Sequence, residues 1–497
     1  MKILRILAAA CLLIPSTFAF ADVTLPSVLA DHMVVQRGLP VHAWGMAAPK
    51  ESVSVTFRGE TKSATADDLG RWSIYLSPSE AGGPFAMTIK AANTITFNDV
   101  LVGDVWVASG QSNMEFAMKS LATPAPEIAA ANYPKIRMFR VEQHPSDYPQ
   151  SNVEAKTWVA CSPESVGDTS AVAYYFARDL QQKLGVPIGL LETFWGGTPA
   201  EAWTSLPSLA ADAALMPVFA ERSDTVNERA STLLHMKQEE IEYKKAVEQS
   251  RADGKPVPWP QWHPDFAAWA PAALFNGMIA PLTPFPIRGV IWYQGEANSG
   301  ERAQHYTRVF RNMILDWRHA WDEGDFPFLF VQIANWTTGP DGRWPEVRDA
   351  QRQALALRNT GMAVTIDIGD AVDIHPKNKK DVGLRLALAA RAISYGEKIE
   401  YSGPLYRQLT TEEHALRVWF DHANGLMAKD GLLVGFEIAG ADGKYVAADA
   451  KIEGPSVVVS SPTVTDPVSV RYAWADNPKC NLYNREGLPA SPFKAPE

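Results

Sequence analysis

Cysteine is scarce in this chain, and the metal-binding patterns that contain it are missing. The 497 residues include 3 Cys, and neither a Cys-x-x-Cys nor a His-Glu-x-x-His pattern occurs. These spacings are typical of zinc sites, so we expect no metal ion, and we expect no other cofactor. Cys11 lies in an N-terminal apolar segment, which leaves Cys161 and Cys480. Both a disulfide between these two and two separate thiols remain open, and we favour separate thiols.

An excess of positive charge is also lacking. Lys and Arg number 46 against 56 Asp and Glu, which gives a formal net charge of −10. Nucleic-acid-binding domains usually present a basic face, so we expect no nucleic-acid partner. Hydrophobic residues make up 46% and charged residues 21%, a globular composition that excludes a wholly disordered chain. The charge does not argue against a neutral or sugar-like substrate.

Apolar runs long enough to cross a bilayer, about 20 residues, are absent as well. The apolar residues 6–14 follow the basic residues Lys2 and Arg5 and precede Ala19-Phe20-Ala21, a small-x-small cleavage pattern. This arrangement is typical of an export signal. We therefore expect residues 1–21 to be removed, a secreted or periplasmic location, and no membrane association after cleavage.

The hydrophobic period divides the rest of the chain into three parts. Residues 22–98 alternate as β-strands do, for example at Val53, Val55 and Phe57, and predict a β-sandwich of immunoglobulin-like size. From residue 99 to about 400 the pattern alternates between strands and helices, which indicates a parallel sheet covered on both faces. The strands are expected at 102–108, 186–194, 287–293, 327–334 and 362–368, and the helices at 172–184, 306–321, 346–357 and 379–393.

Two further segments have their own character. The stretch at about 220–268 begins with a polar, charged part that predicts a helical insertion lying on the surface. Residues 401–497 return to short strands separated by Gly and Asp turns and predict a C-terminal β region. A contact between this region and the N-terminal sandwich is one expectation.

Four polar clusters follow predicted strands, and ligands of open parallel sheets bind beyond the carboxyl ends of strands. In the first, Gly110 stands close before Ser112 at a strand-to-helix turn, which suits a serine nucleophile. The helix N-terminus beyond it offers backbone N–H groups to a developing oxyanion. The clusters are Ser109-Gly110-Gln111-Ser112-Asn113-Met114-Glu115, Trp195-Gly196-Gly197-Thr198, Gln294-Gly295-Glu296-Ala297-Asn298 and Gly369-Asp370-Ala371-Val372-Asp373-Ile374-His375-Pro376.

Three of these clusters carry a resemblance to a known family. The motifs are Gly110-Gln111-Ser112-Asn113-Met114, Trp292-Tyr293-Gln294-Gly295-Glu296-Ala297-Asn298 and Ile374-His375-Pro376-Lys377-Asn378-Lys379, with Asp31-His32-Met33-Val34-Val35-Gln36-Arg37 upstream. Together they resemble the sialate O-acetylesterase family of SGNH-type (GDSL-like) hydrolases, over nearly the whole mature chain. The resemblance implies a three-layer α/β/α hydrolase core with β regions on both sides. It implies removal of acetyl groups from sugar hydroxyls, with Ser112 as nucleophile, His375 as base, and Gly197 (or Gly196) and Gln294 at the oxyanion.

The sequence offers more than one acidic partner for His375. Many SGNH-type enzymes place it three residues before the histidine, where this chain has Val372. Asp373, Asp370 and Glu296 are the remaining candidates, and we favour Asp373, since geometry rather than spacing decides this role. Asn298 is a further candidate, either to orient Ser112 or to bind the oxyanion.

These observations predict an exported serine esterase that hydrolyses O-acetyl esters of carbohydrates, with sialate first among the substrates. An acetylesterase acting on plant hemicellulose and a non-catalytic carbohydrate-binding protein are the alternatives. A small acyl group is expected, because Trp195, Trp292 and Tyr293 stand near the strand ends and could narrow the acyl pocket. The competing interpretation is that these rings point into the core.

Overall fold

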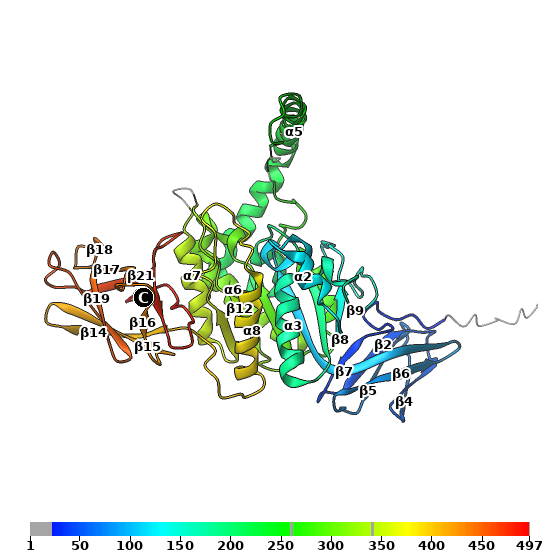
Figure 1. The fold of residues 1–497 in the computed structure, drawn as a ribbon. Coiled ribbons are helices and arrows are strands. Elements are labelled where there is room, and N and C mark those ends of the chain that lie inside the picture. The colour runs from blue at the N-terminus through cyan, green and yellow to red at the C-terminus, as the bar shows by residue number, and fades with distance from the viewer. Residues whose placement is uncertain (1–21, 259–260, 262, 339–341, 497) are drawn as a thin grey trace, which may run out of the picture.

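A single long strand, β7 (Thr94–Gly110), runs from the N-terminal β region into the central sheet. The computed structural model describes residues 22–258, 261, 263–338 and 342–496 (Figure 1). The expected export signal, residues 1–21, lies outside the described residues. The sequence-predicted boundary at residues 98 and 99 falls within β7, so the first two parts of the chain share a continuous strand.

The central sheet is parallel except at one edge. Neighbouring strands pair in parallel, while β8 and β9 pair antiparallel. The chain order reverses at β7, which lies between β10 and β11, and such a switch point is where open α/β sheets bind ligands. In spatial order the strands are β13 (Thr360–Ala363), β12 (Phe328–Val331), β11 (Gly289–Tyr293), β7, β10 (Ile188–Phe194), β8 (Tyr133–Arg140) and β9 (Val159–Cys161).

Helices cover both faces of this sheet. On β7, Trp106 packs edge-on against Phe176 of α3, while on β11 Trp292 packs against Trp317 of α6. Trp292 is in register with Ser109, three residues beyond Trp106, so the two indoles lie on opposite faces. The predicted three-layer α/β/α core is therefore confirmed. The helices are α1 (Ser112–Glu115), α2 (Pro124–Ala129), α3 (Ala171–Leu184), α4 (Leu206–Ala211), α5 (Met216–Ala252), α6 (Ala303–Trp321), α7 (Trp344–Gln353) and α8 (Lys379–Ile393).

The N-terminal region is all-β, as its alternating pattern predicts. In β5 the side chains of Trp72, Ile74 and Leu76 are buried and the residues between them are exposed. A two-stranded sheet, β2–β5, lies beside strands that extend the central sheet through β7. The strands are β1 (Val34–Gln36), β2 (Val41–Met46), β3 (Ser52–Phe57), β4 (Glu60–Thr65), β5 (Arg71–Leu76) and β6 (Gly82–Lys90).

The C-terminal region forms a second β unit with its own core. Val418, Val457, Tyr472 and Phe493 belong to a hydrophobic cluster separate from that of the α/β core. The unit lies at the opposite end of the molecule from the N-terminal strands (Figure 1), so the expected contact between these two regions is not found among the described residues. The α/β core lies between them (Figure 1).

Ten strands build the described part of this C-terminal unit. They form a sheet of order β14–β15–β20–β19, a sheet of order β18–β17–β21–β23 and the pair β16–β22. Their bounds are β14 (Leu405–Glu412), β15 (Ala415–Asp421), β16 (Met427–Ala428), β17 (Phe436–Ala439), β18 (Val446–Ala447), β19 (Asp449–Glu453), β20 (Ser456–Ser460), β21 (Ser469–Tyr472), β22 (Leu482–Tyr483) and β23 (Phe493–Ala495).

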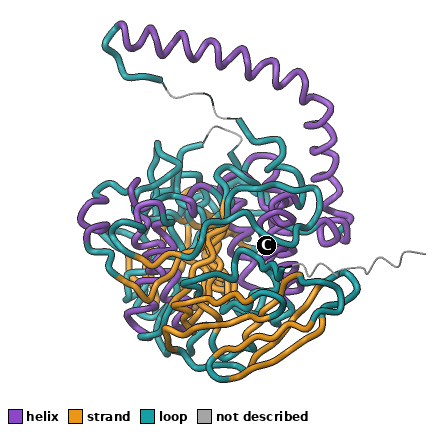
Figure 2. The backbone as a smooth tube through the Cα atoms, turned by 90° about the vertical axis from the view of Figure 1, so that its right-hand side faces the viewer, coloured by secondary structure: helices purple, strands orange, loops and turns teal. Residues whose placement is uncertain are grey.

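The predicted helical insertion is α5, and its position differs from the expectation. It projects from the body as an arm instead of lying on the surface (Figures 1 and 2). Val218, near its start, is its one buried residue in the described part, and Leu233, Leu234 and Ile241 are exposed. These apolar residues are too few to form the continuous stripe that holds a helix on a core.

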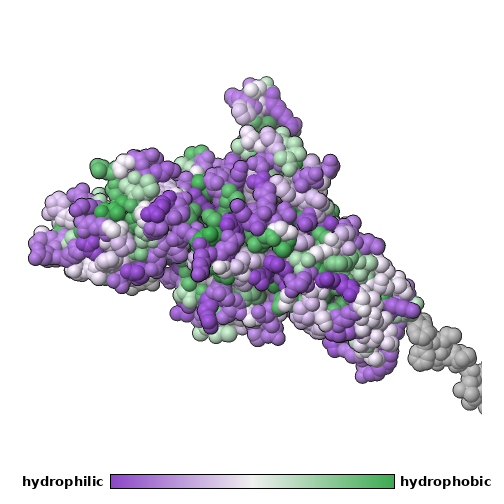
Figure 3. Space-filling view, turned by 60° about the horizontal axis from the view of Figure 1, so that its bottom comes forward, coloured by the Kyte–Doolittle hydropathy of each residue, from purple (hydrophilic) through white to green (hydrophobic). Residues whose placement is uncertain are grey.

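Two other expectations concern cysteine and the membrane. Cys161 is buried, Cys480 is partly buried, and both are free thiols, as we favoured. In the part of the chain that the structure describes, no helix combines the length and the apolarity needed to span a bilayer. On the face shown in Figure 3, hydrophilic residues predominate and apolar ones are scattered among them.

Candidate active site

Ser112 stands at the turn where β7 ends and α1 begins. Gly110 closes the strand with φ at +137°, and a Cβ there would lie 2.1 Å from the carbonyl oxygen of Tyr293. Only glycine fits this turn, which brings β7 and β11 together and directs the next residues beyond the sheet. Ser112 is the first residue of α1, where backbone N–H groups lack helical partners.

His375 lies far from Ser112 in the sequence but next to it in the fold. It lies in the loop between β13 and α8, and its Nε2 is 2.8 Å from Ser112 Oγ. The Asn378 side chain caps α8 by accepting a hydrogen bond from the Asp381 N–H, which fixes the end of this loop. The structure therefore brings together the serine and the histidine that the sequence singled out, at the distance that proton transfer requires.

Asp373 is the carboxylate nearest to the imidazole among the three candidates. Its Oδ1 accepts a hydrogen bond from the backbone N–H of His375 at 2.8 Å and lies 3.8 Å from Nδ1. The second distance is too long for a hydrogen bond. Asp370 instead accepts from the backbone N–H groups of Val372 and Asp373, in a turn that shapes the loop.

Burial and the neighbouring lysines favour the neutral imidazole of His375. Burial is the main cause of its lowered pKa, and the ammonium groups of Lys379 and Lys377 lower it further, while Asp373 opposes them. Partial burial of Asp373 would by itself raise the pKa of that carboxyl. The His375 backbone N–H and Lys377 outweigh burial and lower the pKa of Asp373. A neutral histidine beside an ionised carboxylate is the resting state of a serine hydrolase.

Glu296 does not approach the imidazole but holds the residue next to the serine. Its Oε1 accepts from the side-chain amide of Asn113 at 2.6 Å, and that amide also donates to the carbonyl of Ile374 at 3.0 Å. On its other side the Asn113 oxygen accepts from Lys379. Asn113 and Lys379 belong to the sequence motifs, but nothing in their spacing indicated that they would meet.

The Gly-Gly loop after β10 lies directly against the serine. A Cβ on Gly196 would come within 3.2 Å of Ser112 Cβ, so the loop approaches as closely as glycine permits. The Gly196 N–H donates to Glu115 at 2.7 Å, a contact the sequence did not indicate. The N–H of Gly197 makes no hydrogen bond with any residue that the structure describes. Of the two glycines, Gly197 thus has the free donor.

Gln294 and Asn298 lie behind this loop, and both are fully buried. The Gln294 amide donates to Asn298 Oδ1 at 2.6 Å, and its oxygen accepts from Tyr306. Asn298 Oδ1 also accepts from the Ala200 N–H, while its amide donates to Glu201 at 2.7 Å. Their amide N–H groups are therefore bonded to protein partners, and in this arrangement the two side chains support the loop.

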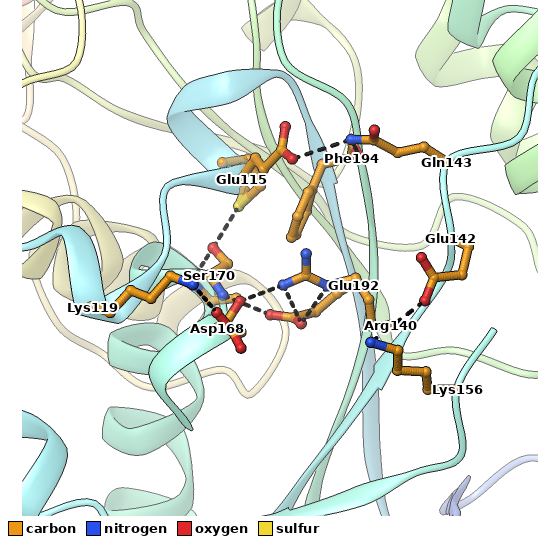
Figure 4. A network of polar contacts seen from close by, with 12 residues as sticks. Glu115, Lys119, Arg140, Glu142, Gln143, Lys156, Asp168, Ser170, Glu192 and Phe194 are labelled. Carbon is orange, nitrogen blue, oxygen red and sulfur yellow. Dashed lines mark hydrogen bonds and ion pairs between the residues drawn. The ribbon is translucent and has the colours of Figure 1, made fainter. Parts of the chain in front are cut away.

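A cleft of about 1210 Å³ opens over the serine and is lined by Ser112, His375, Phe194 and a dense set of charges. Arg140 is one of its cations. The guanidinium bonds Glu192 at 3.0 Å and the Asp168 carbonyl at 2.7 Å, and it lies over the Phe194 ring (Figure 4). Glu192 is 2% exposed and also accepts from the Ser170 N–H, so this arginine is fixed by the protein.

The aromatic residues near the strand ends divide between core and site. Trp292 and Tyr293 are fully buried in the core, and Trp203 packs against Trp292 there. For Trp292 and Tyr293 the competing interpretation was right, and they do not narrow an acyl pocket. Continuous apolar strands buried on both faces give no pattern that would reveal on which side a ring lies. Trp195, beside the Gly pair, is partly exposed.

A family model matches residues 262–393 of the chain and is described as "Carbohydrate esterase, sialic acid-specific acetylesterase". The matched segment holds both Glu296 and His375. It ends at the last residue of α8.

Whole-chain relatives extend this similarity. The mouse protein named sialate O-acetylesterase is 30% identical over 528 residues, covering 94% of this chain and 93% of its own. The human protein of the same name is 31% identical over 523 residues, covering 94% and 92%.

A solved structure has the same fold over nearly its full length. It is a carbohydrate acetylesterase from Xanthomonas citri, 37% identical, with a TM-score of 0.82. The alignment covers 95% of this chain and 99% of the other. The α/β core and the regions on both sides of it thus have a counterpart in a single known structure.

Proposed function

The chain belongs to the sialate O-acetylesterase family and is a carboxylic ester hydrolase, and on this basis we propose that it removes O-acetyl groups from sialate sugars by a serine mechanism. The hydrogen bond of 2.8 Å between Ser112 Oγ and His375 Nε2 carries the mechanistic part of the proposal. The alignment with the mouse and human relatives covers 94% of the chain, and this similarity supports an acetylated carbohydrate as the substrate.

The proposed reaction has two halves. Ser112 Oγ attacks the acetyl carbonyl carbon while His375 Nε2 takes the hydroxyl proton, and the carbonyl oxygen becomes an oxyanion. The proton then passes from His375 to the sugar oxygen as the ester bond breaks, which leaves acetyl-Ser112. Water, deprotonated by the same imidazole, then attacks this ester, and the imidazolium returns the proton to Ser112 Oγ as the acyl–oxygen bond breaks, which releases acetate and restores the free serine. Every step uses side chains and backbone groups of this chain and no metal ion.

In this proposal two backbone groups stabilise the oxyanion. The N–H of Ser112 lies at the start of α1, and the N–H of Gly197, in the loop that packs on the serine, has no hydrogen-bond partner among the described residues. Donors fixed before the reaction lower its barrier because they need no rearrangement as the charge develops. Asp373 is the proposed acidic partner of His375, and a small rotation of the carboxylate or the imidazole would close the gap of 3.8 Å.

An acetylated neutral polysaccharide such as hemicellulose is the second candidate substrate, favoured by the charges of the cleft. Its lining holds six carboxylates and four cationic side chains. Each of these cations lies within 4 Å of a carboxylate of the chain, and these pairs would compete with the carboxylate of a sialate. The pairs are Arg140–Glu192 at 3.0 Å, Lys119–Asp168 at 2.5 Å, Lys156–Glu142 at 3.9 Å and Lys377–Asp373 at 3.2 Å.

Acetate release from two purified substrate classes tests the choice. The sialate proposal expects a higher kcat/KM on O-acetylated sialic acid than on O-acetylated xylo-oligosaccharides. The reverse order would assign the enzyme to neutral polysaccharide. Binding of either sugar without acetate release, by wild type and by Ser112→Ala alike, would instead favour a non-catalytic binding protein. An EDTA-treated sample, which should keep full activity, controls for a metal requirement.

We also propose export to the periplasm or the medium, on the basis of the N-terminal segment alone. Fractionation of cells that express the full chain, followed by N-terminal sequencing, tests it. An extracytoplasmic product beginning at Asp22 is expected. A cytoplasmic product that retains residues 1–21 would contradict it.

A further inference from the structure

Three buried polar side chains form a connection between the serine turn and the histidine loop. Asn113, Glu296 and Lys379 are 1%, 7% and 0% exposed. They come from α1, from the turn after β11 and from the first residue of α8, so they join three elements at the carboxyl end of the sheet. Burying an ammonium and a carboxylate is costly, and such groups persist where their interactions offset that cost.

The Asn113 amide is the centre of this group. Its nitrogen donates to Glu296 at 2.6 Å and to the Ile374 carbonyl at 3.0 Å, and its oxygen accepts from the Lys379 ammonium. A carboxylate on the nitrogen side and an ammonium on the oxygen side permit only one orientation of the amide. In that orientation the residue after Ser112 is bonded to the residue before His375.

Lys379 is held in place by aromatic rings as well. Its ammonium lies 4.9 Å from the centroid of the Phe116 ring and 5.3 Å from that of Tyr293. The pKa of Lys379 is lowered to about 7, mainly by burial and also by Lys377, against the opposing effects of Glu296 and Asp373. Burial likewise raises the pKa of Glu296, and one of its oxygens, Oε2, has no hydrogen-bond partner among the described residues. These groups are therefore kept in water-excluded positions beside the reacting pair.

We propose that Lys379 and Glu296 are positioning residues that fix the Asn113 amide, and through it the Ser112 turn, against the His375 loop. The inference rests on the proposed serine mechanism, since it explains how Oγ and Nε2 are kept within reaction distance. A displacement of about 1 Å between reacting groups lowers kcat by about 100-fold, so a fixed connection between the two loops matters for catalysis. Neither side chain touches the substrate in this proposal.

A double-mutant cycle on kcat tests whether Lys379 acts through Asn113. Lys379→Met and Asn113→Ala are each expected to lower kcat by about 10- to 100-fold with little change in KM. The double variant should lose no more than the more damaging single variant. Losses that multiply in the double variant would show that the two residues act independently and would overturn the proposal.

The pH profile supplies a readout that a merely structural role would not change. Removing the Lys379 charge removes one cause of the low pKa of His375. The acid limb of kcat/KM should therefore move to higher pH in Lys379→Met. Lys380→Met is the matched control, because Lys380 is the next residue, is half exposed and pairs with Glu127. Lys380→Met should keep the wild-type kcat and the wild-type position of the acid limb. An acid limb at the wild-type pH in Lys379→Met would contradict the inference.

A second pair of variants keeps the test decisive if Lys379→Met does not fold. Glu296→Gln retains an oxygen that accepts from Asn113, whereas Glu296→Leu does not. The kcat of Glu296→Gln should stay well above that of Glu296→Leu, provided that near-ultraviolet circular dichroism shows both variants to be folded. Equal kcat values would overturn the proposal. Full activity of Ser112→Ala would be a separate result, because it would remove the serine mechanism itself.

Discussion

Asp373 bonds the backbone of His375 and not its ring. The carboxylate accepts from the His375 N–H at 2.8 Å, while Nδ1 of the imidazole is 3.8 Å away. The same carboxylate pairs with Lys377 at 3.2 Å. Asp373 thus fixes the turn that carries the histidine, and it is also the candidate carboxylate nearest to the ring.

Replacement of Asp373 tests its role as the acidic partner. Asp373→Asn should lower kcat by up to about 10⁴-fold, because the imidazole then loses the carboxylate that holds its tautomer and stabilises its charged form. Asp370→Asn and Glu296→Gln should cost less, since their carboxylates bond other groups. The kcat values of the three variants on one acetyl ester decide the order. A greater loss in Glu296→Gln than in Asp373→Asn would assign the role to Glu296.

The pH dependence of the wild-type enzyme follows from the environment of His375. The active form is the neutral imidazole, and burial together with Lys379 and Lys377 lowers its pKa below the ordinary 6.5 against the opposing effect of Asp373. Protonation inactivates the base, and it occurs only as the pH falls through this lowered pKa. A profile of kcat/KM should therefore have its acid limb below pH 6.5. A limb above that value would contradict the described charge arrangement.

The Arg140–Glu192 pair in the wall of the cleft predicts an effect on stability. Arg140→Met leaves Glu192, which is 2% exposed, without its cation and should lower the free energy of unfolding by about 1–3 kcal/mol. The added change Glu192→Gln removes the unpaired charge and should restore part of the loss. Urea denaturation measures both.

Lys156→Met is the control for this effect. Lys156 is 80% exposed and lies 3.9 Å from Glu142, so its loss should cost less than about 1 kcal/mol. Equal effects of Arg140→Met and Lys156→Met would show that burial of Glu192 does not matter.

The layers of the fold were predictable because their signals are local. Glycine at the end of α3 and the apolar face of α6 mark helices in the sequence, and both helices occur in the structure. β8 was not predicted, because its Pro134, Lys135 and Arg137 interrupt the apolar run. The position of the C-terminal β unit was not predictable either, since strand patterns do not tell which surface a unit packs against.

Some residues of the candidate site could likewise be predicted from the sequence, and others could not. Ser112 and His375 could be singled out because each follows a strand, and the carboxyl ends of parallel strands meet at one edge of the sheet. The bond between Asn113 and Lys379 joins side chains 266 positions apart, and the contact of Glu115 with Gly196 depends on how closely a loop approaches. Such contacts depend on three-dimensional packing, which no spacing in the sequence reports.

The rate of Ser112→Ala is the most direct measure of the central claim that Ser112 is the nucleophile. Loss of a nucleophile lowers kcat by several orders of magnitude, about 10⁶-fold in a well-studied serine protease. Acetate release should fall to near background in Ser112→Ala, with unchanged circular dichroism and melting temperature. A folded Ser112→Ala protein that releases acetate at close to the wild-type rate would contradict the serine mechanism.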